Sequence, residues 1–103
     1  MAATPEKKVK QKLMMRLREL GAYAFYPATG GYGHSGVPDI VGCHKGVFFG
    51  IECKAGKNKV TALQERNLKQ IHEAGGVSCV CYEDDIELTL NYICRAAGCE
   101  YYG

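Results

Sequence analysis

The sequence predicts an α/β fold with a single mixed central sheet flanked by helices. Hydrophobic patterns along the 103 residues follow the order helix, three strands, helix, strand, helix, which is an αβββαβ core plus a C-terminal helix. A strand-helix-strand crossover over residues 47–82 implies a right-handed parallel pair, and a tight turn at residues 44–46 implies an antiparallel hairpin. A chain of this length forms one modest core, so we expect residues 1–103 to be a single domain.

The first predicted helix begins at Thr4, the expected N-cap, and ends at Gly21. Pro5 and Glu6 suit the first helical turn, and apolar residues follow at helical spacing: Val9, Leu13, Leu17 and Leu20. Glu6 either complements only the helix dipole or extends from the end of the buried face toward a site. The basic residues of this helix either contact phosphates or form a solvated face; they are Lys7, Lys8, Lys10, Lys12, Arg16 and Arg18.

A short strand over residues 22–26 is expected to lead into a glycine-rich loop over residues 27–36. Loops of this kind commonly carry function. Tyr32 is a candidate for stacking on a base or sugar, and His34 is a candidate phosphate contact; the alternative is a surface loop without a binding role. No helix follows the glycines, so they do not form a nucleotide-binding fingerprint.

Charged residues at the ends of the predicted hairpin form the main candidate site. Asp39 precedes one apolar run, and Glu52 and Lys54 follow another. The hairpin brings Asp39 back beside Glu52 and Lys54, which share one strand face. Buried carboxylates are normally paired or metal-bound, and such oxygen ligands suit Mg²⁺. Lys54 would then orient or deprotonate a water. The alternative is a solvated cluster of lysine and carboxylates.

A second helix is expected from the cap residue Thr61 to about Ala74. Thr61 and Gln64 have the spacing of a capping box, which alone would explain Gln64. Gln64 also shares a helix face with Leu68 and Ile71, which suggests a role in the site as the alternative. The polar loop before this helix lies beside the candidate site and carries two further basic residues, Lys57 and Lys59.

The last helix is expected to start at residues 83–85 and to carry two apolar faces. The first face contains Ile86, Leu90, Ile93 and Ala97, and the second contains Leu88, Tyr92 and Cys99. One sheet covers only one of these faces. We therefore expect a homodimer through the second face, extended by Tyr101 and Tyr102. The alternative is that the second face packs on the first helix, which would leave a monomer.

The uneven charge distribution fits either an anionic polymer as partner or ordinary solvated helix faces. Residues 1–70 hold 12 Lys and Arg against 5 Asp and Glu, whereas residues 71–103 hold 1 against 6. No secretion signal or membrane-length apolar run is visible, so an intracellular location is expected, either in the cytoplasm of a host cell or associated with a nucleoid. The six cysteines are then expected to be reduced, and neither they nor the histidines have zinc-ligand spacing.

Three motifs in a fixed order resemble the VRR-Nuc (virus-type replication-repair nuclease) family of the PD-(D/E)XK superfamily. They are Gly-Val-Pro-Asp at residues 36–39, Ile-Glu-Cys-Lys at 51–54 and Thr-Ala-Leu-Gln at 61–64. The resemblance extends from Glu6 to about Tyr82 and implies a restriction-endonuclease-like fold. The glycine-rich loop before Val37 is unusually long for the family.

The resemblance also implies an activity and a site. It implies a Mg²⁺-dependent endonuclease, with Mn²⁺ able to substitute, that acts on branched DNA such as four-way Holliday junctions. Asp39, Glu52 and the Cys53 carbonyl would hold the metal, with Lys54, Gln64 and Glu6 as further catalytic residues. The candidate DNA contacts are Lys57, Lys59, Tyr32, His34, Lys8 and Lys12. Two alternatives are a non-catalytic module that binds structured DNA and a cysteine-based redox or metal protein.

Overall fold

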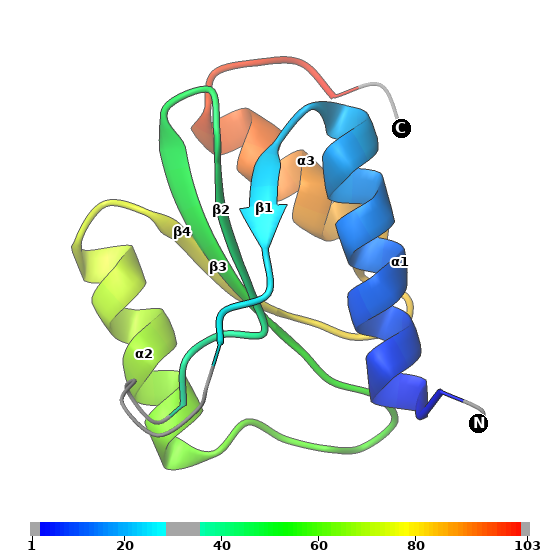
Figure 1. Cartoon of the computed structure of the whole chain (residues 1–103). Helices are drawn as coiled ribbons and strands as arrows, with labels where there is room; N and C mark the ends of the chain where they lie inside the picture. The colour runs from blue at the N-terminus through cyan, green and yellow to red at the C-terminus, as the bar shows by residue number, and fades with distance from the viewer. Residues whose placement is uncertain (1–2, 29–35, 102–103) are drawn as a thin grey trace.

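A computed structural model describes residues 3–28 and 36–101 of the chain. It contains a four-stranded mixed sheet in the order β1-β2-β3-β4, with helices on both faces (Figure 1). The elements are α1 (Pro5–Leu20), β1 (Tyr23–Phe25), β2 (Ile40–His44), β3 (Val47–Cys53), α2 (Ala62–Glu73), β4 (Val77–Cys81) and α3 (Ile86–Ala96). The predicted α/β class and the predicted order of elements are confirmed.

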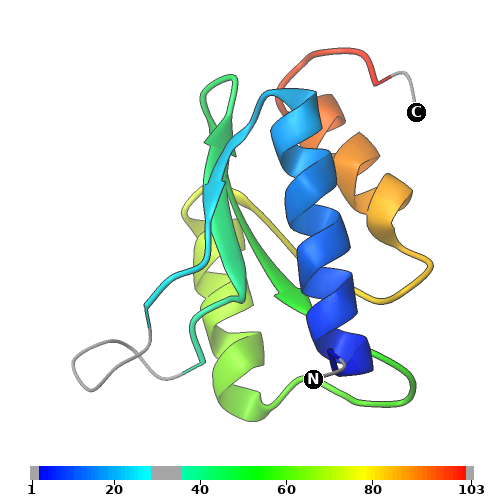
Figure 2. The same cartoon turned by 45° about the vertical axis from the view of Figure 1, so that its right-hand side comes forward.

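Two helices cover one face of the sheet and the third helix covers part of the other. Figure 2 shows α1 and α3 on one side of the strands and α2 on the opposite side. α1 starts at Thr4, whose Oγ1 accepts the backbone N–H of Lys7 at 3.2 Å, and ends at Gly21, which has a left-handed φ of 93°. The core between the sheet and these two helices includes fully buried Leu13, Phe49 and Leu90.

The register of the sheet brings the start of β2 and the end of β3 together. β2 and β3 are antiparallel, with Ile40 opposite Ile51, and β3 pairs in parallel with β4. Lys45 and Gly46 both have positive φ, 48° and 85°, as a two-residue hairpin turn requires. His44 therefore pairs with Val47 as the last residue of β2 and does not lie in the turn, where the sequence placed it.

Gly42 allows β1 to approach β2 closely. A Cβ atom at this position would lie 2.1 Å from the Tyr23 carbonyl oxygen and 2.9 Å from the Ala24 Cα. Both contacts are with backbone, which cannot move aside without breaking the strand pairing. Glycine is therefore required where the first strand joins the hairpin.

The last helix begins at Ile86, later than the sequence predicted. Asp85 is its N-cap residue, but the Asp85 carboxylate accepts a hydrogen bond from the backbone N–H of Tyr82 at 3.1 Å. The Glu83 carboxylate accepts the Gly56 N–H at 3.0 and 3.1 Å and so fastens the loop after β3. These acids order the connection from β4 to α3 and do not form the first turn of the helix.

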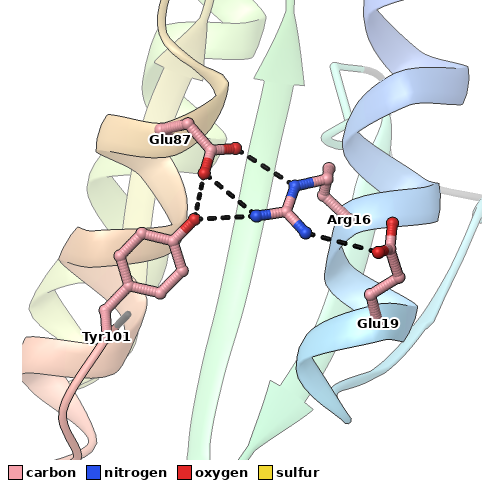
Figure 3. A network of polar contacts seen from close by, with 4 residues as sticks. All are labelled: Arg16, Glu19, Glu87 and Tyr101. Atoms are coloured by element: carbon pink, nitrogen blue, oxygen red, sulfur yellow. Dashed lines mark hydrogen bonds and ion pairs between the residues drawn. The ribbon is translucent and has the colours of Figure 1, made fainter. Parts of the chain in front are cut away.

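Arg16 joins α1 to α3 and to the segment that follows α3 (Figure 3). Its guanidinium donates to the two Glu87 oxygens at 3.0 and 3.2 Å and to the Tyr101 hydroxyl at 3.0 Å, and Tyr101 also donates to Glu87. The hydrogen bond to Arg16, followed by that to Tyr101, lowers the pKa of Glu87. Tyr101 also packs against the hydrophobic core. Arg16 is thus engaged within the chain, and Tyr101 is not part of an exposed dimer face; Tyr102 lies outside the described residues.

The second face of α3 is only partly as expected. Leu88 and Tyr92 are 67% and 41% exposed, whereas Cys99 lies beyond the helix and is partly buried. No helix among the described residues has the length and apolar character needed to cross a membrane.

Candidate active site

The site is built where β2 begins and β3 ends. Asp39 Oδ2 accepts the backbone N–H of Cys53 at 2.8 Å, which closes the open end of the hairpin. This hydrogen bond places the Asp39 carboxylate next to Glu52, the residue before Cys53. The predicted return of Asp39 to the end of β3 is confirmed by this contact.

Glu52 is a buried carboxylate with one unpaired oxygen. Only 2% of the residue is exposed. Its Oε1 accepts a hydrogen bond from Gln64 Nε2 at 3.1 Å, while its Oε2 is buried and has no hydrogen-bond partner among the described residues. Burial raises the pKa of Glu52 to about 8, with a further contribution from the neighbouring Asp39 carboxylate, and Lys54 acts in the opposite direction. The unpaired oxygen is the kind of buried group that normally meets a cation or a proton.

Gln64 caps α2 and also contacts Glu52. Its side-chain oxygen accepts the Thr61 backbone N–H at 2.9 Å, and the Gln64 backbone N–H donates to Thr61 Oγ1 at 3.2 Å. The two bonds complete the capping box. The side-chain nitrogen of Gln64, Nε2, donates to Glu52 Oε1. The cap therefore fixes the rotamer that aims the amide into the site.

Gly36 holds the segment before Asp39 against the start of α2. Its φ is +76°, and a Cβ atom there would lie 2.6 Å from the Leu63 carbonyl carbon and 2.8 Å from the Gln64 backbone nitrogen. The first motif therefore needs glycine because two backbone segments of the site touch at this point.

Lys54 and the Cys53 carbonyl are placed by the pairing of β3 with β4. The Lys54 N–H donates to the Cys81 carbonyl at 3.0 Å, so it points toward β4. In a trans peptide the C=O points opposite to the N–H, and the Cys53 carbonyl therefore faces the side on which the Cys53 N–H meets Asp39. Lys54 is only 8% exposed, and its charge lowers the pKa of Glu52, so the ammonium lies near the carboxylate cluster.

Lys10 is a site residue that sequence reasoning did not distinguish. Its Nζ lies 3.8 Å from Asp39 Oδ1 and 5.4 Å from the centre of the Tyr26 ring. In the sequence it is one of several basic residues on the first helix. The available signal was its position four residues after Glu6, which puts both side chains on one helix face. Glu6 also raises the pKa of Glu52, so its negative charge acts on the site.

An open groove of about 740 Å³ leads to Asp39. Its lining includes Glu6, Lys7, Lys10, Asp39, Lys57 and Asn58. Lys59 is exposed in the same loop as Lys57. Lys8 and Lys12 are exposed but do not line the groove. The charge of Lys12 acts instead on Glu87, where it helps to lower the pKa of that carboxylate. Tyr32 and His34 lie outside the described residues.

The family model described as archaeal Holliday junction resolvase (Hjc) matches residues 5–80. The match starts at the first residue of α1 and covers Asp39, Glu52 and Lys54. The chain belongs to the Hjc family. No curated protein matches the chain.

Membership in the Hjc family indicates the nuclease activity of a Holliday junction resolvase, with branched DNA as substrate. The predicted structured-DNA endonuclease is thereby supported, as is the PD-(D/E)XK superfamily. Resolvases of this type generally use a divalent metal. The finer resemblance to VRR-Nuc depends on the sequence motifs alone.

Thr61→Ala and Gln64→Ala should separate the capping role of Gln64 from its role at Glu52. Thr61→Ala removes the Thr61 Oγ1 bond to the Gln64 backbone N–H and should cost about 1 kcal/mol of stability. It keeps the Thr61 N–H that holds the Gln64 side chain, so the cleavage rate per folded molecule should be unchanged. Gln64→Ala keeps the bond to Thr61 Oγ1 but loses the other half of the capping box, the Thr61 N–H bond to the Gln64 side chain, together with the bond to Glu52. We therefore expect a similar loss of stability and a rate reduced about 10-fold. Thermal unfolding and single-turnover cleavage of a four-way junction measure the two effects. Equal rates in both variants would reduce Gln64 to a capping residue.

Glu52 should make the metal-free protein less stable as the pH rises. Because the folded-state pKa is raised above the unfolded value, folding takes up a proton between about pH 4.5 and about pH 8, and stability falls across that window. Glu52→Gln should remove this decline and be the more stable protein at pH 8. Urea unfolding in EDTA tests this expectation, with Glu65→Gln on the exposed first turn of α2 as the matched control. Parallel pH profiles of wild type and Glu52→Gln would contradict it.

Proposed function

We propose that residues 1–103 act as one Mg²⁺-dependent nuclease domain that resolves Holliday junctions, with Asp39, Glu52 and the Cys53 carbonyl as the metal-binding groups. The observation that carries this assignment is the buried, unpaired Oε2 of Glu52 beside Asp39. The finer VRR-Nuc assignment is part of the same proposal and is supported by the three ordered motifs.

The available donor atoms fit a hard divalent cation. They are carboxylate and carbonyl oxygens, which Mg²⁺ prefers, and Mn²⁺ can take the same ligands. A bound divalent ion would stabilise charge on the phosphate and lower the pKa of a bound water. The raised pKa of Glu52 supports the assignment, because an ion that displaces the Glu52 proton would relieve both burial of the carboxylate and repulsion from Asp39.

The remaining site residues would act on the water and on one another. Lys54, held in a nearly buried position, would orient or deprotonate the attacking water. Gln64 would fix the Glu52 carboxylate through the 3.1 Å hydrogen bond. Glu6 would contribute negative charge from the start of α1, and Lys10 would offset the charge of Asp39 until the metal and the phosphate arrive.

The groove and the loop at residues 56–59 are the proposed DNA surface. Lys7, Lys10 and Lys57 line the groove, so a phosphate chain that reaches Asp39 would pass these three ammonium groups. Lys59 is exposed in the same loop as Lys57 and would add a fourth contact. Lys8 and Lys12, on α1 outside the groove, would contact a second DNA arm. Tyr32 and His34 remain candidates from the sequence.

The proposed functional unit is a homodimer formed through α3. Leu88 and Tyr92 are exposed on this helix next to Ala96, while its opposite face is buried in the core. Pairing about a two-fold axis would cover this surface and hold two active sites in a fixed relation, which suits symmetric cuts in a four-way junction. The sheet offers a competing surface, because Tyr23, Phe25 and Phe48 are 74%, 46% and 48% exposed.

Asp39→Asn and Glu52→Gln should each reduce junction cleavage about 100-fold or more, while DNA binding persists, because each removes a charged metal ligand. Lys54→Met should reduce cleavage by a similar factor but leave Mg²⁺ affinity nearly unchanged. Cleavage of labelled junctions and calorimetric titration of Mg²⁺ measure these effects. Full activity in either carboxylate variant would refute the metal assignment. A wild-type protein that binds junctions but cuts none with Mg²⁺ or Mn²⁺ would favour a non-catalytic module.

Lys57→Glu/Lys59→Glu should reduce the steepness with which junction affinity falls with salt, because fewer counterions are released. Each lost phosphate contact should change the logarithmic slope by about 0.9. Lys45→Glu/Lys69→Glu makes the same change in net charge outside the groove and is the control. Equal slopes in the two double variants would move the DNA surface away from the loop at residues 56–59.

Tyr92→Asp should dissociate the dimer, whereas Phe48→Asp on the exposed sheet face should not. Light scattering at micromolar concentration gives the mass of each. Tyr92→Asp should also lose paired cleavage of a four-way junction more than nicking of a flap, since nicking needs one site. A monomeric wild-type protein would end the dimer proposal, and dissociation by Phe48→Asp alone would place the interface on the sheet.

A further inference from the structure

Three side chains that bind soft metals meet at the end of the sheet remote from Asp39. They are His44 at the end of β2, Cys94 in the last turn of α3, and Cys99 beyond that helix. One ligand atom from each lies within 4.8 Å of the other two, and Cys99 Sγ is 3.8 Å from His44 Nε2. Figure 1 shows the β2–β3 turn beside the end of α3, whereas Asp39 precedes the other end of β2.

Local backbone geometry brings the three residues together. The two-residue turn at Lys45 and Gly46 keeps His44 in the strand, on the same buried face as Ile40. Gly98, with a φ of 72°, reverses the chain after α3, and the Cys99 N–H then donates to the Cys94 carbonyl at 3.0 Å. The cysteine spacing is not that of a familiar zinc motif, so only the fold reveals the cluster.

The distances match a tetrahedral zinc site with little rearrangement. Zinc bonds of about 2.3 Å to sulfur and about 2.05 Å to nitrogen place a sulfur and a nitrogen ligand about 3.6 Å apart and two sulfur ligands about 3.8 Å apart. The Cys99–His44 separation of 3.8 Å is within a few tenths of an ångström of that value. His44 is 4% exposed and Cys94 is fully buried, so two of the three ligands are already desolvated.

The charges also suit zinc. Two thiolates and a neutral imidazole on Zn²⁺ have no net charge, whereas the same ligands on Cu⁺ would bury a net negative charge. A neutral complex is the less costly one in a buried site.

We propose that His44, Cys94 and Cys99 form a zinc site that fastens the segment after α3 to the β2–β3 turn. The described part of the chain adds no fourth His, Cys, Asp or Glu to the cluster, so a water completes the coordination. The site is separate from the nuclease centre, where the proposed ligands are oxygen atoms.

The first test uses Co²⁺ as a spectroscopic substitute for Zn²⁺. The whole protein, kept in a phosphine reductant with excess Mg²⁺ to occupy the nuclease site, is titrated with Co²⁺ and then with Zn²⁺. We expect thiolate-to-cobalt charge-transfer absorption that saturates at one ion per chain and disappears when Zn²⁺ is added. Carboxylate sites do not produce this absorption. Its absence in the wild-type protein would overturn the proposal.

Cys99→Ser should weaken Co²⁺ and Zn²⁺ binding at least about 10-fold, and His44→Gln should do the same. Cys43→Ser is the matched control, because Cys43 is an exposed neighbour of His44 outside the cluster. Zn²⁺ should raise the unfolding temperature of the wild type and of Cys43→Ser but not of Cys99→Ser. Retained junction cleavage by Cys99→Ser would show that this variant is folded. Equal metal binding in Cys99→Ser and Cys43→Ser would overturn the proposal.

A redox-active Cys94–Cys99 pair is the competing explanation of the cluster. Without the reductant, hydrogen peroxide should oxidise the two thiols to a disulfide in the metal-free protein, and one equivalent of Zn²⁺ should slow this reaction. Mass spectrometry of the intact chain and of its peptides measures the rate. Equal rates with and without Zn²⁺ would mean that the thiols do not hold the metal, and the zinc assignment would be wrong.

Discussion

The burial of Glu52 is the constraint on which the candidate nuclease site depends. A carboxylate with 2% exposure is unfavourable in its charged form unless partners replace the lost water. Gln64 supplies one hydrogen bond, and the second carboxylate oxygen has no described partner. The resulting rise in the pKa of Glu52 means that the metal-free site holds a proton near neutral pH. A divalent cation fits this position because its charge would replace the proton and stabilise both acids.

The elements around Glu52 are arranged so that each has a structural and a site role. Asp39 closes the open end of the hairpin through the Cys53 N–H and is also a candidate ligand. Gln64 caps α2 and also reaches Glu52. Gly36 permits the contact between the first motif and the start of α2. Because these groups share backbone contacts, their relative positions are fixed by the fold before a metal or DNA arrives, which reduces the cost of assembling the site.

The two ends of the sheet carry different chemistry. Hard oxygen donors gather where β2 begins and β3 ends, while imidazole and thiols gather at the β2–β3 turn. Mg²⁺ and Zn²⁺ prefer these two donor sets respectively, so the two sites would not compete strongly for the same ion. Apart from these two sites, the network of Arg16, Glu87 and Tyr101 connects α1 to the segment after α3. Its members are partly exposed, so it fixes position more than it contributes stability.

The sequence by itself determined the α/β class, the order of the elements and the main candidate acids. These depend on local patterns: apolar periodicity, the Thr4 and Thr61 caps, and charged residues at the ends of apolar runs. The expected meeting of Asp39 with the end of β3 required only a hairpin. The capping contact of Gln64 and its direction toward Glu52 were also visible, because the capping box is local and its helix face was apolar.

Only the tertiary structure decided which residues from distant segments meet. Among the basic residues of α1, Lys10 contacts Asp39 because the helix packs with that side toward the site. Arg16 forms an ion pair with Glu87 of α3 instead. The tertiary structure assembled His44, Cys94 and Cys99, although their sequence spacing matches no zinc motif. It also placed Cys99 away from the exposed face of α3 and removed Tyr101 from the expected dimer surface. Local patterns fix the direction of each side chain within its element, but the rotation and packing of one element against another determine its neighbours.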